Sequence, residues 1–281
     1  MVGFINVNKR RGDTSAFVVN RIKKIFGEKC GHMGTLDPLA SGVLPVALGR
    51  ASRLFDFLVE KEKTYVARFD FSFTTPSLDL ESEPCDYSDR SVKKQEIIDL
   101  LPHFLGEQMQ IPPDYSAKCV DGKKAYKLAR RGEKPELKPK RVFIKSIELN
   151  EQTGDNEYSF TIVCGGGTYI RSICRDIADK LGVFGVMTSL ERTKSGVFDI
   201  TEAHTLDEIA AASDITKFII PPDEAVTFPK LILSDDNATR ILNGLTEGYA
   251  YKDGVYRVYA FNTFWGVMRS ENGKVKITYV K

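Results

Sequence analysis

The chain has 281 residues, 42% of them hydrophobic and 28% charged, with a formal net charge of only +2. This is the composition of a globular protein, and no apolar run reaches the roughly 18 residues that a membrane-spanning helix needs. The N-terminus lacks the features of a secretory signal peptide, and the five cysteines include no close Cys-x-x-Cys pair. The sequence therefore predicts a reduced, cytoplasmic protein and argues against a membrane protein, a disulfide scaffold and a metal site.

The first predicted helix begins after Thr14 and ends before Gly27. Threonine often caps helix N-termini, and glycine commonly follows the last helical turn. Between these residues, apolar side chains recur at the spacing of one helix face: Phe17, Val18, Ile22, Ile25 and Phe26. We therefore expect an amphipathic helix that packs on a core.

The loop after this helix reads Gly-His-Met-Gly-Thr-Leu-Asp-Pro-Leu-Ala-Ser-Gly-Val-Leu over residues 31–44. Its glycines let the backbone turn sharply and let a ligand approach closely. Pro38 biases Asp37 towards an extended conformation, so this carboxylate is expected outside a helix. With His32 five residues upstream, Asp37 is a candidate catalytic group. An ordinary loop with a turn-forming aspartate is the alternative that the spacing leaves open.

The middle of the chain contains both predicted strands and predicted helices. Aromatic and polar residues alternate from Thr64 onwards, which predicts a strand with Tyr65 on the same face as three phenylalanines. The other predicted elements are strands over 141–149 and 157–164 and helices over 91–101, 122–131 and 170–181. Because they do not follow a strict βαβ rhythm, we expect an α+β fold in which a mixed or antiparallel central sheet is flanked by helices.

Arg171 lies near the start of the last of these helices. If Thr168 caps the helix, Arg171 falls in its first turn, where a cation opposes the helix dipole at a cost of roughly 0.3–1 kcal/mol. A nearby carboxylate or phosphate would compensate for this cost. A solvent-facing arginine without a partner is the alternative.

Pro221-Pro222 is predicted to separate two domains, a larger one over 1–222 and a smaller, β-rich one over 223–281. Asn272-Gly273 is a hairpin signal in the second domain. It joins the last two of three predicted strands, around 255–261, 264–268 and 275–280.

Positive charge is concentrated between Lys118 and Lys145, a segment with eleven basic residues and three acidic ones. A local basic patch on a nearly neutral protein is the electrostatic footprint of a nucleic-acid backbone. A solvated basic helix and loop is the alternative.

Residues 31–44 also resemble, without a gap, the signature of the TruB family of tRNA pseudouridine synthases. Gly167-Thr168-Tyr169-Ile170-Arg171 is similar to a second motif of that family. Shorter elements resemble it at Lys63-Thr64-Tyr65, at Ser189-Leu190-Glu191-Arg192-Thr193 and over 106–118. The likeness extends over roughly residues 2–200, with a departure at Lys9-Arg10-Arg11-Gly12, where the family has a proline after the lysine.

This resemblance implies a pseudouridine synthase fold and a role for each matching residue. Asp37 would be the nucleophile, kept ionised by Arg171. Tyr65 would stack on the target uracil and is a candidate for proton transfer. Tyr169 and Leu190 would shape the pocket, and His32 would fill the space that the flipped-out uridine vacates. The residues expected to bind RNA are Lys118, Lys123, Lys124, Lys127, Arg130 and Arg131, in a basic insertion over 118–145.

The implied reaction is the isomerisation of uridine 55 in the TΨC arm of tRNA, catalysed by a monomer without a cofactor or an obligate protein partner. The smaller domain would be a PUA-like RNA-binding domain. Three alternatives remain open: a non-catalytic tRNA-binding or tRNA-folding protein, a guide-RNA-dependent relative, and a hydrolase in which Asp37 activates water. The lack of a second nearby carboxylate in the sequence argues against the hydrolase.

Overall fold

The computed structural model describes residues 1–58, 61–116, 118–120 and 122–280. Within these residues, nine strands form one mixed sheet with the order β1-β3-β12-β4-β11-β10-β7, while β13 pairs with β12 and β2 pairs with β3. The strands are β1 (Gly3–Lys9), β2 (Cys30–His32), β3 (Ser41–Leu48), β4 (Lys63–Asp70), β7 (Gly106–Gln110), β10 (Lys140–Gln152), β11 (Glu157–Cys164), β12 (Val186–Ser195) and β13 (Phe198–Asp199). A separate two-stranded ribbon is formed by β5 (Phe73–Thr74) and β6 (Asp86–Tyr87).

The pairing in this sheet is antiparallel except where β12 meets β3. There, Glu191 and Arg192 pair in parallel with Ser41 and Gly42. The predicted α+β class with a mixed sheet is confirmed. The parallel contact joins the half of the sheet that follows the Asp37 loop to the half that contains β4 and β11.

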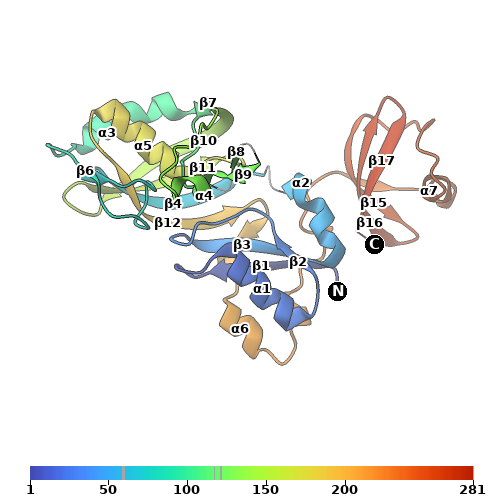
Figure 1. Ribbon diagram of the computed structural model, residues 1–281. Coiled ribbons are helices and arrows are strands. Elements are labelled where there is room, and N and C mark those ends of the chain that lie inside the picture. The colour runs from blue at the N-terminus through green and yellow to red at the C-terminus, as the bar shows by residue number, and fades with distance from the viewer. Residues whose placement is uncertain (59–60, 117, 121, 281) are drawn as a thin grey trace.

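Two groups of helices pack on the sheet (Figure 1). One group contains α1 (Ser15–Phe26) and α6 (Leu206–Ala211), and the other contains α3 (Lys94–Leu100) and α5 (Ile170–Leu181). A single apolar core includes residues from the sheet and from all four helices, among them Ile22, Phe69, Ile97, Ile177 and Ile209.

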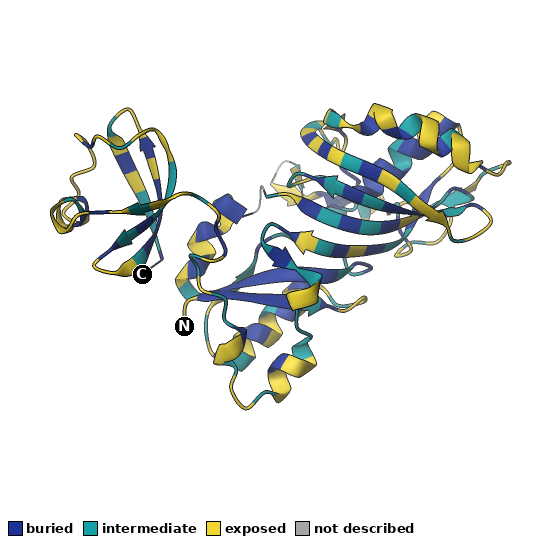
Figure 2. Cartoon of the chain, turned by 180° about the vertical axis from the view of Figure 1, so that it is seen from behind, coloured by how far each residue is buried: buried dark blue, intermediate teal, exposed yellow. Residues whose placement is uncertain are grey.

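Strands β1 and β3 are buried on both faces, which Figure 2 shows as nearly continuous dark blue. One face contributes to the core just described. On the other face, Phe4, Val43 and Ala47 belong to a second cluster with Phe57 of α2 (Phe55–Leu58) and with Leu54 of the preceding 3-10 helix.

The ends of α1 agree with the sequence prediction. The Thr14 side chain accepts a hydrogen bond from the Phe17 amide at 3.0 Å, and Gly27 adopts the left-handed conformation that ends the helix. The cap predicted for α5 is wrong, because Tyr169 and not Thr168 occupies the N-cap position. The Thr168 hydroxyl instead donates to the Gly165 carbonyl at 2.9 Å. Arg171 still falls in the first turn of α5.

Two further predicted helices begin later than expected. Helix α3 starts at Lys94 because side chains bind the two preceding backbone amides. The Val92 amide donates to the Asn156 side chain, and the Lys93 amide donates to the Glu96 carboxylate at 2.8 Å. The helix predicted over 122–131 is replaced in part by a hairpin of β8 (Cys119–Val120) and β9 (Lys123–Lys124), followed by the short α4 (Ala125–Ala129). Gly122 has a φ of 78°, which suits a turn and not a helix.

The C-terminal part forms its own sheet in the order β14-β15-β16-β17, accompanied by one helix. These elements are β14 (Lys230–Ile232), α7 (Asp235–Leu242), β15 (Gly254–Ala260), β16 (Thr263–Glu271) and β17 (Lys274–Tyr279). The predicted hairpin at Asn272-Gly273 is confirmed, with φ values of 50° and 73°. The three predicted strands are present, and the parallel strand β14 was not predicted.

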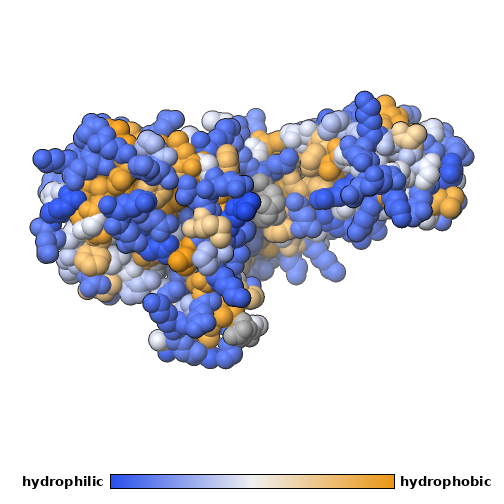
Figure 3. Space-filling model, turned by 90° about the horizontal axis from the view of Figure 1, so that it is seen from above, coloured by the Kyte–Doolittle hydropathy of each residue, from blue (hydrophilic) through white to orange (hydrophobic). Residues whose placement is uncertain are grey.

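The C-terminal sheet has its own core around Trp265 and Tyr249. It contacts the rest of the chain through Val267 and Val280, and the Arg269 guanidinium lies 5.3 Å from the centre of the Phe57 ring. Figure 3 shows the C-terminal part beside the rest of the chain, with apolar patches scattered over a mostly hydrophilic face. None of the helices in the described ranges is long and apolar enough to cross a membrane.

Candidate active site

The Asp37 loop connects β2 to β3 and is held by backbone contacts on both sides. The Leu36 amide and carbonyl both bond to the Ser15 hydroxyl at 2.9 Å, at the start of α1. The Gly12 amide donates to the Pro38 carbonyl at 2.7 Å. These contacts fix the backbone around Asp37, while its side chain stays one-third exposed.

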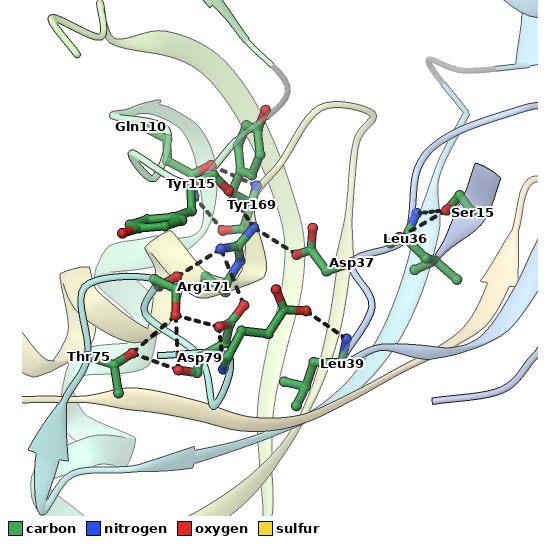
Figure 4. A network of polar contacts seen from close by, with 12 residues as sticks. Ser15, Leu36, Asp37, Leu39, Thr75, Asp79, Gln110, Tyr115, Tyr169 and Arg171 are labelled. Atoms are coloured by element: carbon green, nitrogen blue, oxygen red, sulfur yellow. Dashed lines mark hydrogen bonds and ion pairs between the residues drawn. The ribbon is translucent and has the colours of Figure 1, made fainter. Parts of the chain in front are cut away.

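Asp37 forms an ion pair with Arg171, which lies far away in the sequence (Figure 4). The Arg171 Nη2 atom is 2.9 Å from Asp37 Oδ2, and the Arg171 side chain is only 4% exposed. The first turn of α5 thus brings a buried positive charge to a carboxylate that can still reach a ligand. This ion pair also provides the partner that a cation at a helix N-terminus needs.

Arg171 has a second carboxylate partner that the sequence analysis did not identify. Its Nη1 atom lies 3.3 Å from Asp79 Oδ2, and Asp79 is buried. Asp79 Oδ1 accepts hydrogen bonds from the Ser77 hydroxyl at 2.6 Å and from the Glu81 amide at 3.0 Å. The same guanidinium also donates to the Ser77 and Tyr115 carbonyls. Its plane is therefore fixed from several directions.

Tyr65 and Leu190 lie on neighbouring strands and belong to the main core. Tyr65 is 7% exposed and faces the same side of β4 as Ala67 and Phe69. Burial raises the pKa of the Tyr65 hydroxyl, and the nearby positive charge of Arg192 counteracts this. The negative charge of Asp37 adds a smaller contribution that raises this pKa further.

Tyr169 precedes α5 and is tied to the edge strand β7. The Gln110 side chain accepts from the Tyr169 amide at 2.8 Å and donates to its carbonyl at 3.1 Å. Burial raises the pKa of the Tyr169 hydroxyl, and the negative charge of Asp37 adds to this effect. The structure therefore brings Tyr169 and Arg171 together beside Asp37 (Figure 4).

His32 is half-buried on β2, five residues before Asp37. Burial lowers the pKa of its imidazole, and the positive charge of Arg192 lowers it further. Its Nδ1 atom is buried and has no hydrogen-bond partner among the residues that the structure describes. Both effects favour the neutral form of the ring.

Lys9 and Arg192 also hold the site, and the sequence analysis assigned neither a role. The Lys9 ammonium donates to the carbonyls of Arg10, Asp13 and Pro38. Burial lowers the pKa of Lys9 to about 8. The strand alternation of β12 could have identified Arg192 in the sequence, because it puts Arg192 on the same buried face as Leu190.

The basic residues lie on and around the β8–β9 hairpin and α4. Lys123, Lys124, Lys127, Arg130 and Arg131 are exposed, and Lys118 is half-buried. The carbonyl of Tyr115, three residues before Lys118, accepts a hydrogen bond from Arg171 at 3.1 Å. This contact connects the start of the basic segment directly to the Asp37 site.

Two family models match the chain in consecutive segments. The model described as TruB family pseudouridylate synthase (N terminal domain) matches residues 23–170, and the model described as tRNA pseudouridylate synthase B C-terminal domain matches residues 171–227. The first segment contains Asp37, Tyr65 and the basic segment, and Arg171 opens the second.

Bacterial proteins align with the chain over nearly its whole length. A protein of Clostridium kluyveri named tRNA pseudouridine synthase B is 38% identical, with 99% of this chain and 98% of that protein covered. The protein of the same name from Caldanaerobacter subterraneus subsp. tengcongensis is also 38% identical, with coverages of 98% and 97%.

Among solved structures, a chain from the crystal structure of a Cbf5–Nop10–Gar1 complex superimposes with a TM-score of 0.74 at 26% identity. The alignment covers 98% of this chain and 83% of the other. The resemblance inferred from the motifs is thus confirmed, and the chain belongs to the TruB family and is a pseudouridine synthase, an isomerase.

Proposed function

We propose that this enzyme converts uridine 55 in the TΨC arm of tRNA into pseudouridine, with Asp37 as the nucleophile. The observation that carries the proposal is the pairing of a one-third exposed Asp37 with a buried Arg171 guanidinium. The guanidinium fixes the position of the carboxylate while leaving it open to a ligand, as a nucleophile in an active site requires. The bacterial relatives named tRNA pseudouridine synthase B support tRNA as the substrate.

The reaction rearranges one nucleoside and consumes no second substrate. The bond between uracil N1 and ribose C1′ breaks, the ring rotates, and C5 forms the new bond to C1′. The hydrogen on C5 leaves as a proton and N1 gains one, so no oxidant or reductant is needed. Asp37 supplies the attacking oxygen, and the Tyr65 hydroxyl is a candidate for moving a proton.

The target uridine has to leave its stack to reach Asp37, at a cost of a few kcal/mol. We assign its binding to the side chains around the carboxylate. Tyr65 stacks on the uracil, while Tyr169 and Leu190 form the walls of the pocket. His32, a half-buried imidazole on β2, fills the vacated space in the RNA.

The RNA arm is gripped by the basic segment over 118–145. A groove next to the β8–β9 hairpin is lined by four lysines and two glutamates: Lys118, Lys134, Lys138, Lys140, Glu133 and Glu136. Exposed lysines and arginines hold phosphates without reading the bases. We further propose a catalytic domain over 1–222 and a PUA-like, RNA-binding domain over 223–281, consistent with the separate core of the C-terminal sheet.

The enzyme is proposed to act as a cytoplasmic monomer without a cofactor or a protein partner. The similar length of the bacterial relatives supports a stand-alone enzyme, since the alignment with the Clostridium kluyveri protein covers 98% of that chain. Activity of the purified chain on a bare transcript tests this proposal.

Substitution of Asp37 tests the nucleophile. Tritium release from a stem-loop labelled at uridine C5 follows the proton that the reaction expels. Asp37→Asn should abolish this release and leave the affinity for the stem-loop within about threefold, a change of less than 1 kcal/mol. Asp207→Asn is the matched control, because Asp207 is an exposed carboxylate that pairs with Arg10. Undiminished release by Asp37→Asn would contradict the assignment and favour a different catalytic group.

A guide-RNA-dependent enzyme is the second candidate, favoured by the likeness to a chain from a Cbf5–Nop10–Gar1 complex. It predicts no turnover on a bare tRNA transcript and turnover only with added RNA and protein partners.

A further inference from the structure

Arg192 lies on β12 between two strands that contribute to the site. Its strand partners are Tyr65 on β4 and Gly42 on β3. Arg192 is 1% exposed and is the largest of the fully buried side chains in the described residues. A charge this deeply buried needs specific partners to compensate for its lost hydration.

The guanidinium finds two of these partners in the backbone on either side of Asp37. Its Nε donates to the Val43 carbonyl at 2.7 Å, and its Nη2 donates to the Gly34 carbonyl at 3.1 Å. Gly34 precedes Asp37 by three residues, and Val43 follows it by six. One side chain therefore holds both ends of the Asp37 loop.

The same guanidinium lies against the aromatic side of the site. Tyr65 is its direct cross-strand neighbour, and such neighbours have their Cβ atoms about 5 Å apart. Its charge counteracts the rise in the pKa of Tyr65 that burial causes, so the two side chains are electrostatically coupled. Arg192 is thus the group in contact with the Asp37 loop and adjacent to Tyr65.

We propose that Arg192 is a positioning residue that holds the Tyr65 hydroxyl and the Asp37 carboxylate in register, and that it determines the rate of the chemical step and not RNA affinity. The inference rests on the proposed roles of Asp37 and Tyr65. The planar guanidinium donates in several fixed directions at once, whereas a lysine ammonium is a point charge on a flexible stem. Lysine at this position keeps the charge but cannot hold the two carbonyls and Tyr65 in the same geometry.

Single-turnover kinetics with enzyme in excess over labelled stem-loop test the proposal. Arg192→Lys should lower the rate at saturation by about tenfold to hundredfold, as expected for a small misplacement of reacting groups. Its dissociation constant should stay within about threefold of the wild-type value, which is less than 1 kcal/mol. A wild-type rate, or a loss confined to affinity, would overturn the proposal. Arg192→Gln also removes the positive charge. If Arg192→Gln unfolds, Arg192→Lys alone tests the proposal.

Arg257→Lys is the matched structural control. Arg257 also donates to two backbone carbonyls, those of Phe228 at 2.7 Å and Asp223 at 3.1 Å, but in the C-terminal part. Arg257 is only partly buried, so this variant should lose less thermal stability than Arg192→Lys and should keep the wild-type single-turnover rate. Equal loss of rate in both variants would show that destabilisation alone explains the result for Arg192.

A double-mutant cycle with Tyr65→Phe separates the positioning role from general damage to the loop. If Arg192 acts through the Tyr65 hydroxyl, the double variant should be no more than about twofold slower than the slower single variant. Fully multiplicative losses would overturn the coupling. If the wild-type enzyme itself released no tritium from this stem-loop, the proposed function would fail, which is a different outcome from any of those above.

Discussion

Asp79 and Arg171 form an ion pair in which both side chains are buried, with 3.3 Å between Asp79 Oδ2 and Arg171 Nη1. Arg171 is thus shared between a buried carboxylate and the partly exposed Asp37. Asp79 compensates the buried charge permanently, so that Asp37 remains available for chemistry while still being held in place.

Asp79→Ala should therefore be destabilising, because it leaves the Arg171 charge buried with only one carboxylate. Breaking a buried ion pair from one side typically costs about 3–5 kcal/mol. The free energy of unfolding, measured by denaturant titration, checks this value. Asp236→Ala is the comparison, since the pair of Asp236 with Arg240 is exposed and should contribute less than about 1 kcal/mol. Similar small losses in both variants would contradict the structural role of Asp79.

The β8–β9 hairpin and α4 should together determine RNA affinity and its dependence on salt. Each phosphate contact removed lowers the slope of log K against log salt by about 0.7–0.9. Lys123→Gln and Lys127→Gln, which alter exposed residues, should each weaken binding with such a change in slope and leave the saturating single-turnover rate intact. Lys24→Gln, at an exposed position near the end of α1, is the control and should leave the slope unchanged. An unchanged slope for Lys123→Gln and Lys127→Gln would show that RNA binds to a different surface.

His32 should titrate below its ordinary pKa of 6.5, because burial and then the charge of Arg192 disfavour the imidazolium. Between pH 6.5 and the folded-state value, the unfolded chain binds a proton that the folded chain does not. The contribution of His32 to the free energy of unfolding therefore decreases as the pH falls through this window and is constant above it. An NMR titration of the imidazole measures the value directly, and His32→Gln should show a shallower loss of stability below pH 6.5. A pKa above 6.5 would be inconsistent with a buried, neutral ring.

Gly42 should tolerate no side chain, because β3 and β12 approach closely there. Its φ is 96°, and a Cβ atom would lie 2.3 Å from the Arg192 carbonyl oxygen. Gly42→Ala should cost several kcal/mol through strain and backbone displacement, of the order given for overpacking and unfavourable φ together. Gly12→Ala is the matched control, since Gly12 has a φ of 92° but open space around the added atom. Equal thermal shifts in the two variants would rule out the close approach as the cause.

The features that sequence predicts well are those that local chemistry determines. The ends of α1, the alternation around Tyr65 and the hairpin at Asn272-Gly273 all depend on a few adjacent residues. The Asp37–Arg171 pair came from motif resemblance, because no periodicity relates two residues so far apart.

The features that sequence did not predict depend on contacts between distant segments. Arg192 becomes a site residue only when β12 pairs with β3 and β4, and Asp79 only when α5 places Arg171 beside it. The helix predicted over 122–131 includes β9, which instead pairs with β8 in a hairpin. The turn at Gly122 and the binding of the Ala125 amide to the Lys118 carbonyl at 2.8 Å determine the observed path.

The most direct test of the central claim is to map pseudouridine at position 55 in tRNA from three strains. One lacks the gene for this chain, and the other two are the same deletion strain complemented with the wild-type gene or with the Asp37→Asn gene. The proposed function predicts uridine at this position without the chain, pseudouridine with the wild-type chain, and uridine again with Asp37→Asn produced at the same level. Pseudouridine at position 55 in the deletion strain, or its restoration by Asp37→Asn, would contradict the claim that this carboxylate performs the reaction.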